Sequence, residues 1–138
     1  MNTYHIIYKR LLALGIHADS GADSRRSLSG GFMDLVVERL HHLDADIPDQ
    51  PGLVYSMAHY FEQNGDLCSD PEMTLIVYPE RESAEALSYQ QAIPPMYQVV
   101  YPAEGSVITA HKRELNSFLK TWLNTLRVQG HGKRWITT

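Results

Sequence analysis

Apolar residues recur with helical spacing near both ends of the chain. Residues 3–14 repeat them every three or four positions, and residues 115–126 do so over a longer stretch. That period places the apolar side chains on one face of a helix, which can then pack on a core. The sequence therefore predicts a short helix that ends at Gly15, and a longer one that Thr109 caps and Gly130 closes.

The middle of the chain is rich in β-branched and aromatic residues, which alternate with polar residues in places. This composition and a period of two are typical of strands. Pro94 and Pro95 cannot both occupy a hydrogen-bonded ladder, so we expect a hairpin corner or a sharp bend between two strands there. The strands are expected over residues 32–40, 53–63, 73–80, 85–93 and 96–102.

The order of these elements predicts one α+β domain over residues 1–138. We expect a four- to five-stranded antiparallel sheet with the N-terminal and the long C-terminal helix packed on one face. Residues 16–31 are rich in Ser, Gly and Asp and show no period, which predicts an exposed and flexible loop. The tail at residues 132–138 is too short to predict an element of its own.

The charges are unevenly distributed along a chain whose net charge is −4. Between Arg39 and Arg81 the sequence has eight Asp and Glu residues and no Lys or Arg. Residues 109–138 hold six Lys and Arg residues, with Glu114 as their one acidic residue. An acidic middle and a basic end predict different kinds of partner, because each attracts surfaces of the opposite charge.

The single cysteine, Cys68, excludes a disulfide within the chain. No segment reaches the roughly 20 apolar residues that a membrane span requires. Residues 1–10 lack the charged and apolar layout of a signal peptide. We therefore expect a soluble protein of the cytoplasm that does not contact a membrane.

The acidic stretch HYFEQNGDLCSDPEM, residues 59–73, joins two expected strands and is too long for a tight turn. Its oxygen atoms could serve a calcium ion, but apolar residues interrupt the alternating ligands that such a loop needs, so we expect no metal. Turn signals at Asn64-Gly65 and at residues 69–72 predict a structured loop instead. The residues expected to contact a partner are Glu62, Asn64, Asp66, Asp70 and Glu72.

The sequence shows no group of residues at the spacing of a known catalytic motif. Cys68, Ser27 and Ser29 are candidate nucleophiles, yet none of them lies in a nucleophile motif. His41 and His42 would point to opposite faces of a strand, which disfavours a shared metal ion. His59 alternates with apolar residues, as a half-buried structural histidine would. We expect a protein that is not an enzyme and needs no cofactor.

The basic C-terminal segment supports a rival hypothesis, a regulatory protein that binds nucleic acid through phosphate contacts. An aromatic residue near the end of the chain also indicates docking, either on the body of the same chain or on a second copy in a homodimer. The residues that would carry this nucleic-acid binding are Lys112, Arg113, Lys133, Arg134 and Trp135.

Four segments resemble an uncharacterised family of small bacterial proteins carried on integrative conjugative elements and plasmids. They are FMDLVVERL, SMAHYFEQNGDLCSDPEMTLIVYPE, AEALSYQQAIPPMYQVVYP and KRELNSFLKTWLNTLRVQGH. The likeness covers residues 32–131 and leaves out the loop at 16–31. It implies a cytoplasmic accessory protein of a mobile genetic element, with no catalytic residue to assign.

Charge and resemblance together give the expected function. We expect a non-catalytic protein that binds a partner protein with a basic surface, such as a host nuclease or a CRISPR complex that it would inhibit. The eight acidic residues between Arg39 and Arg81 are the reason, because such a surface competes for sites that are built for phosphates. Nucleic acid is the secondary candidate partner.

Overall fold

The structure, a computed structural model, describes residues 2–17, 22–45 and 51–138. Within these residues it contains two α-helices, two short 3-10 helices and a single antiparallel sheet. The helices are α1 (Thr3–Leu14) and α2 (Thr109–Val128), with η1 (His41–Leu43) and η2 (Pro79–Arg81). The strands are β1 (Ser24–Ser27), β2 (Leu35–Arg39), β3 (Leu53–Gln63), β4 (Asp66–Tyr78), β5 (Ser83–Gln91), β6 (Met96–Val99) and β7 (Trp135–Thr137).

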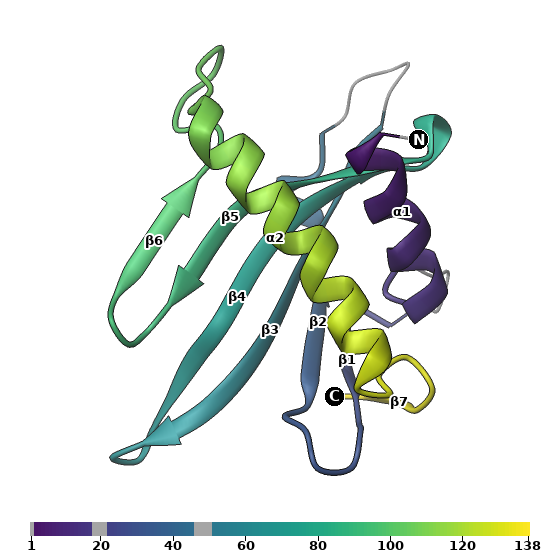
Figure 1. Cartoon of the computed structure of the whole chain (residues 1–138), viewed down its shortest axis with the longest axis vertical. Helices are drawn as coiled ribbons and strands as arrows, with labels where there is room; N and C mark the ends of the chain where they lie inside the picture. The colour runs from purple at the N-terminus through teal and green to yellow at the C-terminus, as the bar shows by residue number, and fades with distance from the viewer. Residues whose placement is uncertain (1, 18–21, 46–50) are drawn as a thin grey trace.

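The sheet of the described chain has seven strands in the order β6-β5-β4-β3-β2-β1-β7, and every neighbouring pair is antiparallel. The α+β class and the two helices agree with the sequence-based expectation, but the expected number of four to five strands is wrong. The two additional strands are β1, inside the segment expected to be a loop, and β7, inside the tail (Figure 1).

Strand β1 shows why the sequence pattern missed these elements. Its two buried positions are Arg25 and Ser27, so no apolar alternation marks it. The guanidinium of Arg25 donates to the carbonyls of Gly15 and Ile16 at 2.9 and 2.6 Å, which satisfies a buried cation through the backbone. The predicted loop at 16–31 is therefore wrong at residues 24–27, and residues 18–21 lie outside the described chain.

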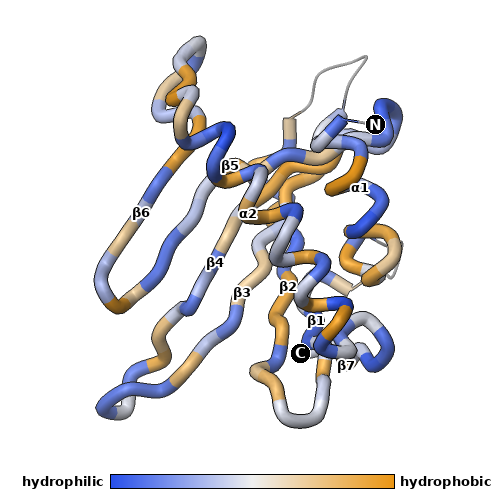
Figure 2. The backbone as a smooth tube through the Cα atoms, viewed as in Figure 1, coloured by the Kyte–Doolittle hydropathy of each residue, from blue (hydrophilic) through white to orange (hydrophobic). Residues whose placement is uncertain are grey.

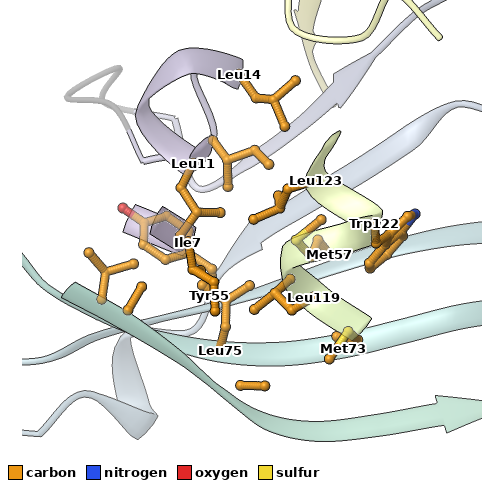
Figure 3. Packing of buried hydrophobic residues seen from close by; sticks show 14 of the residues in the cluster. Ile7, Leu11, Leu14, Tyr55, Met57, Met73, Leu75, Leu119, Trp122 and Leu123 are labelled. Atoms are coloured by element: carbon orange, nitrogen blue, oxygen red, sulfur yellow. The ribbon is translucent and has the colours of Figure 1, made fainter. Parts of the chain in front are cut away.

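Both helices pack on the same face of the sheet. Figure 3 shows Leu119 and Leu123 of α2 above Met57 and Leu75 of the central strands, and the apolar side chains of α1 beside them. Figure 2 shows hydrophobic residues where the helices meet the sheet and hydrophilic residues at the β3–β4 turn. We call the other side of the sheet, which neither helix covers, the open face.

The helix boundaries follow from local chemistry. In α1, the side chain of Asn2 accepts a hydrogen bond from the backbone N–H of His5, and Gly15 ends the helix in the left-handed region at φ 78°. Both features confirm the predicted helix over residues 3–14. The prediction that Thr109 caps α2 is wrong, because Ile108 occupies the cap position and offers no side-chain hydrogen bond.

The long β3–β4 hairpin corrects the expected loop at residues 59–73. The predicted strand over residues 53–63 is confirmed, but β4 begins at Asp66, seven residues before the predicted start at Met73. Asn64 and Gly65 make a two-residue turn with φ values of 54° and 84°, the positive values that suit the twist of a tight hairpin. The acidic stretch is therefore mostly strand.

The remaining expectations fall close to the observed elements. β2 is shorter than the predicted strand over residues 32–40, and His41 and His42 lie in η1 rather than in a strand. Pro94 and Pro95 lie between β5 and β6, as the predicted corner requires.

Candidate interaction site

The outer half of the β3–β4 hairpin carries most of the residues expected to bind a partner. In Figure 1 it extends beyond the part of the sheet that α2 crosses. Cross-strand pairs there are Tyr60 with Ser69, Phe61 with Cys68, and Glu62 with Leu67. Because successive side chains of a strand point to opposite faces, this register decides which carboxylates act together.

Strand alternation places Glu62 and Glu72 on the open face. Met57 and Met73 belong to the core under the helices, so residues at odd offsets from them point the other way. Glu72 is paired with Ala58 in β3 and Gln90 in β5, and it points to the open face. Glu62 lies on the same face further along β3.

The other three predicted residues lie elsewhere on the hairpin. Asn64 is in the turn, and Asp66 follows on the side opposite to Glu62. Asp70 lies where the β3–β4 pairing is irregular, and its charge adds to burial in raising the pKa of Tyr89. The structure thus divides the predicted set between two sides of the hairpin.

Tyr60 interacts with Glu72 and also with the charge of a third carboxylate, that of Glu38. Its hydroxyl donates to Oε1 of Glu72 at 3.2 Å. Burial, then the charge of Glu72, and last the charge of Glu38 raise the pKa of Tyr60 to about 12. Glu62 lies two residues, or about 7 Å, beyond Tyr60 on the same face.

We define the acidic patch as Glu38, Glu62 and Glu72 together with Tyr60, on which the charges of Glu38 and Glu72 act. Glu38 was missed in the predicted set because it precedes the acidic stretch by more than twenty residues. The sequence did indicate that Glu38 is on a sheet surface, because it belongs to the polar face of the alternating segment that forms β2. Only the strand register, however, brings β2 beside the hairpin.

Among the described residues, the carboxylates of the patch have no cationic partner. In the described part of the chain, the ion pairs are Lys9–Glu82, Arg26–Asp34, Arg39–Asp44 and His41–Asp23, and none of them includes a patch residue. The absence of Lys and Arg between Arg39 and Arg81 explains this directly. The patch therefore presents uncompensated negative charge.

An apolar hollow adjoins the acidic patch. It has a volume of about 160 Å³ and is lined by Arg26, Met33, Asp34, Val36, Tyr60 and Leu67. Leu67 is 68% exposed and Met33 is 46% exposed, so large apolar side chains lie at the surface here. Apolar groups beside charges that point to solvent are the usual composition of a protein-binding surface.

The residues of the rival nucleic-acid hypothesis do not form one surface. Lys112 and Arg113 lie in the first turn of α2, whereas Lys133 and Arg134 follow its C-terminus, and a helix of 20 residues spans about 30 Å. The half-buried indole of Trp135 donates to the carbonyl of Leu14 at 3.2 Å. The guanidinium of Arg25 lies 4.5 Å from its ring, so Trp135 docks on its own chain.

A serine and a histidine meet inside the fold. The hydroxyl of Ser27 lies 3.0 Å from Nδ1 of His131 and accepts a hydrogen bond from the backbone N–H of Gly132. Their exposed fractions are 0% and 3%, so a substrate cannot reach either without displacement of the tail. The pair connects β1 to the segment after α2. His59 is buried beside them, with its ring 5.9 Å from that of His131.

Neither a metal cluster nor a membrane span is found in residues 2–17, 22–45 and 51–138. No group of three or more His, Cys, Asp and Glu side chains there could hold an ion. No helix of this part of the chain is long and apolar enough to cross a membrane.

The model of a family described as domain of unknown function DUF6908 matches residues 7–132. The chain belongs to this family. The DUF6908 match agrees with the expectation of an uncharacterised family, and it includes the segment at 16–31 that the resemblance left out. Neither the curated proteins nor the solved structures give a match.

Proposed function

We propose that this DUF6908 protein acts without catalysis, by binding a partner protein that presents a basic surface. The acidic patch and the adjoining apolar hollow would form the contact. The observation that carries the proposal is the uncompensated charge of Glu38, Glu62 and Glu72 on the face of the sheet that no helix covers. Charges of this kind speed the encounter with a basic surface and select against acidic ones.

The exposed apolar residues beside the acidic patch would supply affinity for the partner. Charges at the rim of an interface affect the rate of association and its salt dependence, whereas buried apolar side chains supply much of the affinity. Leu67 and Met33 would insert into the partner, while Tyr60 offers a ring and a hydroxyl between the carboxylates. Tyrosine is among the residues that interfaces favour.

The wider role follows from the resemblance to proteins of mobile elements. We place the protein in the cytoplasm of a bacterium that carries such an element. Its partner would be a host defence protein, a nuclease or a CRISPR complex, whose nucleic-acid site it would occupy in place of phosphates. Inhibition of that partner is the expected consequence.

An affinity capture from host lysate tests the proposal. The wild type is compared with a variant carrying Glu38→Lys, Glu62→Lys and Glu72→Lys. The matched control makes the same charge change at exposed positions elsewhere, through Glu80→Lys, Glu104→Lys and Glu114→Lys. Each protein is tested with and without nuclease treatment of the lysate.

The expected result is a protein that the wild type and the control retain after nuclease treatment and that the patch variant loses. The captured protein should also have a basic surface and a nucleic-acid site. Retention by all three proteins, or recovery that nuclease abolishes, would contradict the proposal.

A further inference from the structure

A second surface, distant from the acidic patch, lies where the two helices begin. One hollow of about 520 Å³ is lined by residues that include Asn2, Tyr4, His5, Ser83 and Lys112. A second hollow of about 460 Å³ shares Asn2, Tyr4 and Lys112 with it. Together they form a groove, and Figure 1 shows the start of α1 at the opposite end of the molecule from the β3–β4 turn.

The groove is basic in a chain that is acidic overall. Its lining includes Arg81, Lys112, Arg113 and Lys120, and among the described residues that line it Glu85 is the one carboxylate. The hydroxyl of Tyr101 donates to Glu85 at 2.6 Å, and the charge of Glu85 adds to the raised pKa of Lys112, so this carboxylate offsets part of the positive charge. The local excess of positive charge contrasts with the net charge of −4 for the whole chain.

Lys112 lies in both hollows and is held by aromatic rings. Its ammonium group is 5.7 Å from the ring centre of Tyr4 and 5.6 Å from that of Tyr101. The hydrogen bond with Tyr101 is the main cause that raises the pKa of Lys112, so the amine stays charged at neutral pH. A fixed cation of this kind is preorganised for an anion.

The backbone and one hydroxyl add further donors. Neither α1 nor α2 has an acidic residue in its first turn, and no side chain caps α2. The start of α2 therefore has neither a side-chain cap nor an acidic residue to offset its dipole, whereas Asn2 caps α1. The buried Oγ of Ser83, which lines the first hollow, has no hydrogen-bond partner among the described residues.

We propose that this groove binds a small phosphorylated molecule. A phosphate group would lie beside the first half of α2, where the side chains of Lys112 and Arg113 line the second hollow. The rest of the ligand would extend into the larger hollow toward Tyr4 and Ser83. Hollows of 460 and 520 Å³ fall in the range of small-molecule sites, about 300–1,000 Å³. This inference is independent of the proposed binding of a partner protein.

Titration of the full chain with pyrophosphate and with adenosine diphosphate, followed by amide NMR, tests the groove. We expect both to shift the amide signals of residues 109–113 and of Ser83. Tighter binding of the nucleotide would identify an organic phosphate as the ligand, and equal binding would identify the inorganic group. Either outcome supports the site, whereas no shift at millimolar ligand would overturn it.

Substitutions sharpen the test. Lys112→Gln with Arg113→Gln should weaken binding about tenfold or more, since a hydrogen bond to a charged group contributes at least one factor of ten. Lys133→Gln with Arg134→Gln removes the same charge beyond the other end of α2 and should leave affinity unchanged. Arg113→Gln alone is an exposed change that preserves folding and should still weaken binding.

Two outcomes would contradict the inference. The first is an equal loss of affinity in both double variants, which would indicate only a general effect of charge. The second is a single-stranded oligonucleotide that shifts the same amides at much lower concentration than the nucleotide, which would make the groove a nucleic-acid site.

Discussion

The covered face and the open face of the sheet differ in how far their polar side chains are buried and paired. Under the helices, Asn116 of α2 and Ser27 of β1 are buried and hydrogen-bonded inside the fold. Oδ1 of Asn116 accepts the backbone N–H of Ala86 at 2.8 Å, and Ser27 meets His131 at 3.0 Å. On the open face, Glu38 and Glu62 carry charge that no cation of the described chain compensates.

This difference separates the residues that the fold needs from those that it does not. A buried polar group without its partner costs free energy, so paired groups such as Asn116 are part of the folded structure. Solvated carboxylates without a partner contribute little to stability. The exposed outer part of the open face, where Glu62 lies, is therefore free to serve an interaction, and substitutions there and in the core should have very different consequences.

The largest expected effect comes from the apolar core under α2. Leu119 is fully buried, and Leu119→Ala should lower the free energy of unfolding by about 2–5 kcal/mol, because it removes burial and leaves a cavity. Leu67→Ala on the hairpin should change it by less than about 0.5 kcal/mol, since that side chain is exposed. Urea denaturation of both variants measures the contrast, and equal losses would show that the hairpin is part of the core.

The next largest effect concerns Asn116, a buried polar residue of α2 that is hydrogen-bonded to the sheet. Asn116→Ala leaves the buried backbone N–H of Ala86 without an acceptor and should cost about 1–3 kcal/mol of unfolding free energy. Asn124→Ala, at an exposed position of the same helix, is the control and should cost much less. If both substitutions cost the same in urea denaturation, Asn116 has no special role.

A pH effect should follow from the buried histidine after α2. Burial is the main cause that lowers the pKa of His131 below its usual 6.5, and the nearby His59 adds to it. The unfolded chain therefore binds the proton more readily, so stability is present above pH 6.5 and is lost as the pH falls through the lower pKa of the folded state. For one proton the slope is at most about 1.4 kcal/mol per pH unit.

Urea denaturation between pH 7 and pH 5 measures this slope. His131→Gln should reduce it, whatever its effect on stability at pH 7. Part of the slope should remain, because burial and the charge of Arg39 also lower the pKa of His17. An unchanged slope in the variant would show that His131 does not titrate differently in the folded state.

The smallest expected effect is that of the acidic patch on stability. Glu62→Lys should change the unfolding free energy by less than about 0.5 kcal/mol, because Glu62 has no ion pair to lose. Thermal unfolding at low salt measures it. A loss of the size expected for Asn116→Ala would mean that the patch serves the fold rather than a partner.

The two faces also explain how far the sequence could predict the structure. Periodicity indicated both helices and the strand over residues 53–63, because the apolar groups of these elements face one core. It could not indicate β1, where Arg25 and Ser27 occupy the buried positions and backbone partners satisfy them. Nor could it indicate β7, whose three residues depend on pairing with β1.

The candidate site was predicted in part. The absence of Lys and Arg between Arg39 and Arg81 predicted an interaction site on the hairpin. The structure places Glu62 and Glu72 on one face of it. Glu38 could not be added, because its pairing with Ser56 in β3, and so its electrostatic effect on Tyr60, depends on a register between distant strands. The basic residues at either end of α2 do not form one set, because the helix that the sequence predicts between them separates them by about 30 Å.

The most direct test of the central claim is the affinity of the purified partner for three forms of the protein, measured by calorimetry at two salt concentrations. We predict that the variant with Lys at positions 38, 62 and 72 loses affinity at least about tenfold, as removal of a few charged contacts should. The control with Lys at positions 80, 104 and 114 should keep it, and added salt should weaken the wild type. Equal affinity of all three forms, with no dependence on salt, would contradict an acidic interaction surface on the open face.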